Sequence, residues 1–350
     1  MKPTLYHKIM LSSFTFTLLI ILNSCTEKVK SATTDMPIEK TAFSFKNPIL
    51  AHGADPWVIK KDSIFYYCYS ANNTLWVQTT HKLHDLKNAT TIAQWTPEEG
   101  QSYSKELWAP ELHFINHYWY IYFAADNGNN DNHRMYVLKS KNENDLSGGF
   151  EFAGQLKTSS DKWAIDGTVA EIKNQLYFIW SGWEGDQNVS QNLYIAKMKS
   201  PTEIASDRVL ISKPEYAWEK LGSENGLPTI NEGPEVLQHA NETFIIYSAS
   251  GSWSNYYQLG ELHLTGNDPL NPEDWKKKEN PVFTGANEVY SPGHASFVTI
   301  QKESWIVYHT ARHKDAGWDR EVRIQPFTWR NNEPEFGKPI PTDSTITITY

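Results

Sequence analysis

The chain has 350 residues, a formal net charge of −9, 39% hydrophobic residues and 13% aromatic residues. No Lys/Arg cluster of the kind that tracks phosphates is present, which excludes nucleic acid as an expected partner. Only two cysteines occur, Cys25 and Cys68, and Cys25 lies in a targeting segment. No disulfide framework can therefore hold the fold, but a chain of this length can bury a sufficient core without one.

Residues 1–25 have the pattern of an export signal. A basic start precedes an apolar run at 9–22 that is too short to be a comfortable membrane span. The run ends in LNSC at 22–25, which resembles the lipobox of bacterial lipoproteins, whose cysteine is acylated. We predict lipidation at Cys25, with an ordinary secretory signal as the alternative. Lipid chains would hold the protein to a membrane without spanning it.

This signal predicts a bacterial cell-envelope protein on the outer membrane, and leaves open whether it faces the periplasm or the outside. Residues 26–42 are polar and predict a flexible tether. Residues 43–350 then form the folded domain. No accessory sugar-binding domain is expected, and the alternating Thr/Ile tail at 342–350 predicts a strand that closes the fold.

Five aromatic-rich runs recur along the domain, and each predicts a buried strand. They are IFYY at 64–67, WYIY at 119–122, LYFIW at 176–180, TFIIY at 243–247 and WIVY at 305–308. A short polar element with Pro or Gly precedes each run, and a further strand follows most of them. Such a unit cannot bury its own faces, but radial stacking buries them. The repeat therefore predicts an all-β, five-bladed β-propeller, with a β-sandwich or jelly roll as the alternative.

Three of the polar elements carry an acid: Asp55, Asp166 and Glu232. We predict that these acids occupy equivalent strand starts in blades 1, 3 and 4 and face one pocket. Glycoside hydrolysis needs two carboxyl groups at the scissile bond, and a third carboxylate can raise the pKa of the acid. The alternative for any one of them is a turn former at a strand start.

The segments GADP at 53–56, AIDG at 164–167 and NEGP at 231–234 resemble, in order and spacing, the three signature segments of glycoside hydrolase family 43. The resemblance extends from about residue 47 to 336. It implies a five-bladed propeller and an inverting mechanism that requires no cofactor.

Carried over by position, the resemblance makes Asp55 the general base that activates water and Glu232 the general acid. Asp166 would tune and orient the acid. Glu235 is the alternative for the acid role, but Glu232 precedes Gly-Pro as in the family motif.

Several other residues are candidates for substrate binding. Trp108 and Trp253 lie beside the polar elements and are expected to stack on the sugar, while Glu111 binds substrate or braces the ring. Family members place an arginine against the sugar hydroxyls, and its planar fork of donors suits that role. Among the arginines of the last blade we choose Arg323, with a surface ion pair as the alternative.

His294 is the counterpart of these elements in blade 5. In similar proteins a histidine at this place faces the central channel and often contacts a water-coordinated calcium or sodium ion. One histidine alone is weak support for a metal, so a structural ion at His294 stays an open alternative.

Family 43 members act mainly on α-L-arabinofuranosides and β-D-xylosides. The segments LWAPE at 107–111 and RIQPF at 323–327 are more similar to the arabinofuranosidase branches. We therefore expect an exo-acting α-L-arabinofuranosidase on arabinan or arabinoxylan side chains. A β-D-xylosidase, a galactan-active enzyme and a lipid-anchored sugar-binding propeller without catalysis are the alternatives.

Overall fold

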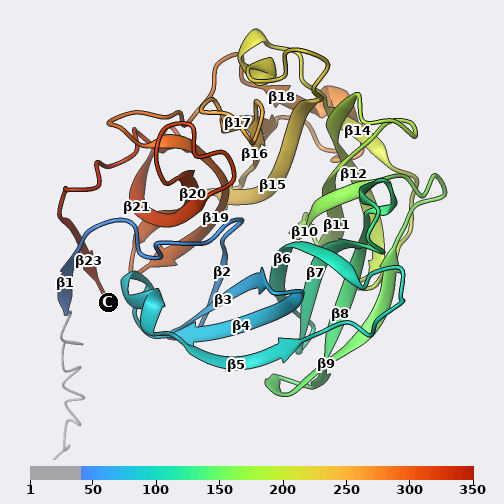
Figure 1. The fold of residues 1–350 in the computed structure, drawn as a ribbon, viewed down its shortest axis with the longest axis horizontal. Coiled ribbons are helices and arrows are strands. Elements are labelled where there is room, and N and C mark those ends of the chain that lie inside the picture. The colour runs from blue at the N-terminus through green and yellow to red at the C-terminus, as the bar shows by residue number, and fades with distance from the viewer. Residues whose placement is uncertain (1–40) are drawn as a thin grey trace, which may run out of the picture. The chain divides into compact units, whose positions relative to one another are not determined.

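The computed structural model describes residues 41–350, whose regular structure is almost entirely β-strand (Figure 1). The predicted signal, the predicted lipidation site Cys25 and nearly all of the predicted tether lie outside the described residues. Within them, no helix has the length and apolar character needed to cross a membrane.

Five groups of antiparallel strands form the blades, and a short parallel pairing joins the third and fourth groups into one nine-stranded sheet (Figure 1). Blade 1 is β2(Trp57–Lys61), β3(Ile64–Ala71), β4(Thr74–Thr80) and β5(Thr90–Trp95). Blade 2 is β6(Lys105–Ile115), β7(Tyr118–Asp126), β8(Arg134–Asn142) and β9(Asp145–Leu156). Blade 3 is β10(Ala164–Ile172), β11(Gln175–Gly182), β12(Ser190–Ser200), β13(Glu203–Ile204) and β14(Val209–Ser212).

Blade 4 is β15(Thr229–His239), β16(Glu242–Ala249), β17(Gln258–Leu264) and β18(Trp275–Lys277). Blade 5 is β19(Tyr290–Ile300), β20(Glu303–Ala311), β21(Arg320–Arg330) and β22(Glu333–Glu335). The short 3-10 helices are η1(Leu83–Asn88), η2(Asn130–Asn132), η3(Ala217–Lys220) and η4(Pro272–Asp274).

The innermost strands close a ring. Strands β2, β6, β10, β15 and β19 contact one another in succession, and β19 contacts β2. The prediction of a five-bladed propeller is therefore confirmed. The tail does form a strand, β23(Ile346–Thr349), but it pairs with β1(Ala42–Phe45) rather than with a blade. This pairing joins the two ends of the domain (Figure 1).

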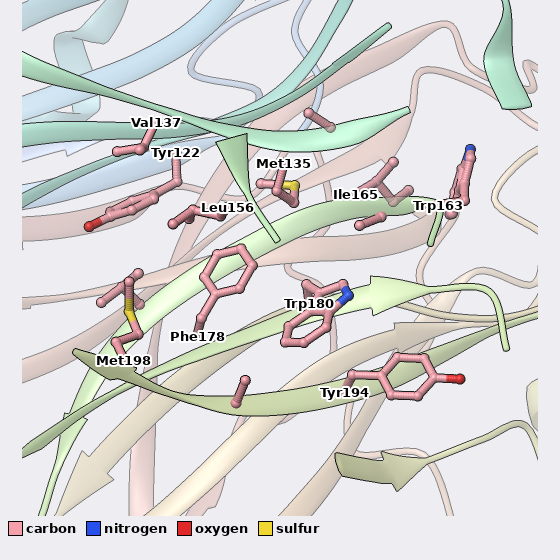
Figure 2. Close-up of a cluster of buried hydrophobic side chains, with 14 of the residues drawn as sticks. Tyr122, Met135, Val137, Leu156, Trp163, Ile165, Phe178, Trp180, Tyr194 and Met198 are labelled. Atoms are coloured by element: carbon pink, nitrogen blue, oxygen red, sulfur yellow. The ribbon is translucent and has the colours of Figure 1, made fainter. Parts of the chain in front are cut away.

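The core lies between neighbouring blades. Figure 2 shows one such cluster, in which Tyr122 and Met135 of blade 2 lie near Phe178 and Trp180 of blade 3. Both faces of a blade are covered by its neighbours, so central strands such as β7 are buried along almost their whole length. This explains why these strands appear in the sequence as continuous apolar runs rather than as alternating patterns.

Each innermost strand carries an irregularity at the polar element predicted from the sequence. At this place one residue per blade has a positive φ: 48° at Asp55, 40° at Ala109, 53° at Asp166, 54° at Gly233 and 44° at His294. In blades 2 to 5 the strand register shifts there, as in a β-bulge. A bulge sets two residues against one on the partner strand and re-aims their side chains.

The strand register corrects the prediction that the three acids occupy equivalent positions in their blades. Asp55 and Asp166 are equivalent in their blades, but Glu232 lies one position earlier, because Gly233 holds the positive-φ place in blade 4. Glu232 pairs with Ser248 just as Ile165 pairs with Ser181. In blade 3 both Ile165 and Asp166 line one cavity, so an acid at either of these two neighbouring positions can reach it, and Glu232 does so in blade 4.

Candidate active site

A cavity of about 740 Å³ lies where the innermost strands begin. Its lining includes side chains from all five blades: Asp55, Trp108, Asp166, Glu232, His294 and Arg320. The three predicted acids are thus brought to one place from elements up to 177 residues apart in the chain. The volume is in the range of small-molecule sites.

Glu232 is the most strongly protonated of the three acids. Its carboxyl is buried, and Tyr257 Oη donates a hydrogen bond to Glu232 Oε1 at 2.9 Å. Burial, followed by the negative charge of Asp166, raises the pKa of Glu232 to about 8. At neutral pH this side chain therefore holds a proton that it can donate.

Asp166 lies directly beside the strand that carries Glu232. Its Oδ2 accepts a hydrogen bond of 3.0 Å from the backbone N–H of Gly233. Burial raises the pKa of Asp166 to about 6; the charge of His294 opposes this rise and that of Asp55 adds to it. Asp166 is consequently ionised at neutral pH, and its charge acts on Glu232.

Asp55 has the opposite environment. Its Oδ1 lies 3.2 Å from His294 Nδ1, 3.3 Å from His309 Nδ1 and 3.5 Å from Arg320 Nη1. Burial alone would raise the pKa of Asp55, but the charge of His294 and its hydrogen bond to the carboxylate hold that pKa well below its usual value. The carboxylate is 26% exposed, toward the cavity. It is thus an ionised base with access to water.

The two histidines next to Asp55 differ in charge. Asp55 and Asp166 raise the pKa of His294 to about 9, although burial alone would lower it. Burial and the charge of Arg320 lower the pKa of His309 to about 3. His309 is therefore neutral, and its Nδ1 accepts the backbone N–H of Asp55 at 3.0 Å. That bond supports the positive-φ conformation of Asp55.

A polar network fixes the strand just before Glu232. Glu219 is fully buried and accepts hydrogen bonds from Asn231 Nδ2, Tyr247 Oη and Lys277 Nζ at 3.0, 2.9 and 2.7 Å. Asn231 Oδ1 accepts a further bond from Ser212 Oγ at 2.7 Å. A network in which every polar group has a hydrogen-bond partner is rigid. These bonds therefore fix the backbone that carries Glu232.

Aromatic rings form much of the cavity wall. Trp108, Trp163, Trp253 and Trp318 all line it, and stacking of Trp108 and Trp253 on the sugar stays a prediction. The Trp253 Nε1 donates to Gly222 O at 2.8 Å, which fixes its ring on the rim. Trp318 is 67% exposed, and its ring meets that of Trp253 edge to face at 6.5 Å.

Two predicted binding residues lie elsewhere. Arg323 is 1% exposed and donates to Glu321 Oε1, Thr342 Oγ1 and Ile340 O, away from the cavity. Arg320 lines the cavity instead. Side chains alternate along a strand, and these two arginines of β21 are three residues apart, so they face opposite sides.

Glu111 does not line the main cavity either. It is buried below it, beside Gly233 and His294, and its Oε2 lies 2.9 Å from His113 Nε2. On β6, Glu111 comes after Trp108, and a shift in strand register separates the two residues. The Glu111 side chain therefore lies further along the central channel. Of the two roles expected for Glu111, this position suits bracing of the ring and not contact with substrate.

His294 lines the cavity, but its surroundings do not suit a directly bound metal. Its Nδ1 is engaged with Asp55, and residues 41–350 contain no group of three or more His, Cys, Asp or Glu side chains that could hold a metal ion. A calcium or sodium ion held through water at His294 stays a prediction, and no catalytic step depends on it.

The sequence did not identify Tyr257 or His309 as site residues, and it favoured Arg323 where the structure places Arg320. Tyr257 is fully buried, bonds to Glu232, and stacks on His309 at a ring distance of 5.6 Å. Gly293 is the residue that makes room for it, because a Cβ there would lie 2.2 Å from the Tyr257 ring. Gly293, which precedes His294 in the PGH segment at 292–294, was the one sequence signal for this aromatic neighbour.

The fold is a β-propeller, and its cavity holds three carboxyl groups whose pKa values differ from one another. This combination defines the class of the β-propeller glycoside hydrolases. The family model described as "Glycosyl hydrolases family 43" matches residues 45–334. The chain belongs to that family.

Similar proteins are known by sequence and by structure. An extracellular exo-α-(1→5)-L-arabinofuranosidase of Streptomyces avermitilis is 33% identical, over 85% of this chain and 64% of that protein. α-L-Arabinofuranosidase 43 of Humicola insolens is 29% identical, over 87% of this chain and 65% of that protein. This chain thus spans slightly less than two thirds of each of these two relatives.

The crystal structure of an α-L-arabinofuranosidase from Lactobacillus brevis superimposes with a TM-score of 0.77 at 33% identity. The match covers 86% of this chain and 98% of that one. A thermostable family-43 glycoside hydrolase matches with a TM-score of 0.70 at 25% identity.

Proposed function

We propose that this protein is an inverting exo-α-L-arabinofuranosidase that releases terminal arabinofuranosyl residues from arabinan or arabinoxylan. One observation carries the proposal: an ionised Asp55 and a protonated Glu232 line the same sugar-sized cavity. The names of the relatives from Streptomyces avermitilis and Lactobacillus brevis support arabinose as the sugar.

In this mechanism Asp55 removes a proton from a water molecule as that water attacks the anomeric carbon. Glu232 gives its proton to the departing glycosidic oxygen as the C–O bond breaks. Water thus replaces the leaving group from the opposite face, which inverts the anomeric configuration. His294 and Arg320 stabilise the negative charge of Asp55 before the reaction, and Arg320 also lies within reach of sugar hydroxyls in the cavity.

Asp166 has the role of keeping Glu232 protonated. The activity kcat/KM is expected to fall as pH rises through about 8, where Glu232 loses its proton. It also falls at acidic pH, where Asp55 becomes protonated. The working range lies between these two limits.

Replacing Asp166 by asparagine is expected to move the alkaline limb of kcat/KM to lower pH by roughly one unit. The reason is that the substitution removes the negative charge that disfavours ionisation of Glu232, while asparagine still accepts the Gly233 N–H. Asp161→Asn is the control, because Asp161 is 48% exposed and does not line the cavity. An unchanged alkaline limb in Asp166→Asn would show that Asp166 does not tune the acid.

The sugar is tested by comparing 4-nitrophenyl α-L-arabinofuranoside with the β-D-xyloside and the β-D-galactoside. The arabinofuranoside is expected to be hydrolysed with the highest kcat/KM, and arabinan to release only arabinose. A faster reaction on the xyloside would favour a β-D-xylosidase. Binding of arabino-oligosaccharides without hydrolysis of any substrate would favour a sugar-binding propeller.

We further propose that the protein is exported and held at the cell envelope by an acylated Cys25. The export pattern of residues 1–25 and the extracellular relative from Streptomyces avermitilis support secretion, and the LNSC segment supports the lipid anchor. Metabolic labelling with an alkyne fatty acid tests this, with Cys25→Ala as the variant that loses the label.

A further inference from the structure

Tyr257 lies between the proposed acid and the groups beside the proposed base. It comes directly before β17 and is 1% exposed. Its ring stacks on that of His309 at a ring distance of 5.6 Å and an interplanar angle of 14°. The guanidinium carbon of Arg320 lies 5.5 Å from the ring centroid, and the absence of a Cβ at Gly293 leaves the space that the ring fills. These contacts fix the ring, so the hydroxyl group is held in one place.

That hydroxyl gives the two oxygens of Glu232 different surroundings. Tyr257 Oη donates to Glu232 Oε1 at 2.9 Å, and Tyr257 itself does not line the cavity. Burial and the charge of Glu232 raise the pKa of Tyr257 well above its usual value, so the phenol keeps its hydrogen at neutral pH. Glu232 Oε2 makes no hydrogen bond within residues 41–350, yet it is not fully buried, and Glu232 lines the cavity. Oε2 is therefore the oxygen from which a proton can reach the substrate.

We propose that Tyr257 is a positioning residue for the acid step, which keeps the transferable proton on Glu232 Oε2 and stabilises the carboxylate that remains after transfer. This inference rests on the proposed function. The proton passes from Oε2 to the glycosidic oxygen as the C–O bond breaks, and the phenol keeps its own hydrogen throughout.

The hydrogen bond from Tyr257 changes in strength during this step. Before transfer the phenol donates to an uncharged carboxyl group, and as the proton leaves, the acceptor becomes a carboxylate. Hydrogen bonds to a charged acceptor are roughly twice as strong as neutral ones. The bond is thus stronger in the transition state than in the ground state, which is the condition for accelerating a chemical step.

The groups that face Glu232 agree with this role. Burial and the charge of Asp166 raise the pKa of Glu232 to about 8, and the hydrogen bond from Tyr257 opposes this rise more than the charges of His294 and Arg320 do. Asp166 thus disfavours the carboxylate form and Tyr257 favours it. Together they let Glu232 hold a proton at neutral pH and still release it.

Tyr257→Phe tests the inference, because it removes the hydroxyl and keeps the ring against His309 and Arg320. On arabino-oligosaccharides we expect kcat/KM to fall roughly three- to tenfold, as for the loss of one hydrogen bond. On a 2,4-dinitrophenyl arabinofuranoside, whose phenolate leaves without a proton, little change is expected.

The pH profile separates this role from a merely structural one. In Tyr257→Phe the alkaline limb on arabino-oligosaccharides is expected to move to higher pH by roughly half a unit to one unit, since the carboxylate of Glu232 loses a donor. The acidic limb should stay in place, because the groups around Asp55 are unchanged. A loosened site that admits water would instead weaken the effect of burial and move the alkaline limb to lower pH.

Tyr308→Phe is the matched control. Tyr308 is fully buried, its Oη donates to Gln325 Oε1 at 2.8 Å, and it does not line the cavity. Both variants are expected to lower Tm, since each leaves a buried acceptor without its donor. Tyr308→Phe should keep the wild-type kcat/KM and both limbs of the pH profile.

The outcomes separate the two proposals. If the wild type hydrolyses neither arabino-oligosaccharides nor aryl arabinofuranosides, the proposed function fails. If the wild type is active, three results for Tyr257→Phe each overturn the inference: an unchanged alkaline limb, a limb at lower pH, or an equal loss on good and poor leaving groups.

Discussion

We expect Asp55→Asn to lower kcat/KM on arabinofuranosides by roughly 10² to 10⁴-fold, because the variant has no carboxylate to take a proton from water. The fold should persist, since asparagine tolerates the positive φ of 48° at this position. Steady-state kinetics with 4-nitrophenyl α-L-arabinofuranoside measures the loss, and the Tm of the purified variant checks the fold.

A small anion should restore turnover when the Asp55 side chain is removed. Glycine adopts a positive φ without strain, so Asp55→Gly leaves room for azide. Azide attacks the anomeric carbon as the leaving group departs, has no proton to lose, and gives the β-L-arabinofuranosyl azide. Asp62→Gly is the control, because Asp62 has a similar φ of 57° on an exposed turn of the same blade. Full activity of Asp55→Asn would remove Asp55 from the base role.

Glu232→Gln is expected to reduce hydrolysis according to the leaving group. Arabino-oligosaccharides need a proton on the departing oxygen, so their kcat/KM should fall by roughly 10² to 10⁴-fold. A 2,4-dinitrophenyl arabinofuranoside should be much less affected, because its phenolate leaves without a proton. The alkaline limb of the pH profile near pH 8 should disappear for this activated substrate.

Glu235→Gln is the control for this experiment. Glu235 is two residues beyond Gly233 on the same strand, is equally buried, and does not line the cavity. Any loss in this variant should be the same for good and poor leaving groups. A leaving-group dependence in Glu235→Gln but not in Glu232→Gln would transfer the acid role to Glu235, the alternative that the sequence leaves open.

The architecture could be predicted because the sequence repeats. Runs such as WYIY at 119–122 are apolar throughout, since each blade is covered on both faces, and that pattern marks central strands without any knowledge of their neighbours. Asp55, Asp166 and Glu232 could be placed at one cavity because they recur at the entry to an innermost strand. The repeat alone did not show that Glu232 lies one residue before the position that Asp55 and Asp166 occupy in their blades.

Contacts that depend on side-chain direction or on ring closure could not be predicted. Arg323 and Arg320 look alike in sequence, and only the pairing of β21 decides which of them faces the cavity. His309 reaches Asp55 across 254 residues because blade 5 closes against blade 1.

The most direct test of an acid–base pair that flanks one water molecule is the configuration of the first product. Proton NMR of the wild-type enzyme acting on an α-L-arabinofuranoside, recorded before mutarotation, reports which anomer forms first. Attack by water activated by Asp55 predicts that β-L-arabinofuranose appears first. Initial formation of the α-anomer would show that a covalent intermediate forms, and would contradict the roles of Asp55 as general base and Glu232 as general acid.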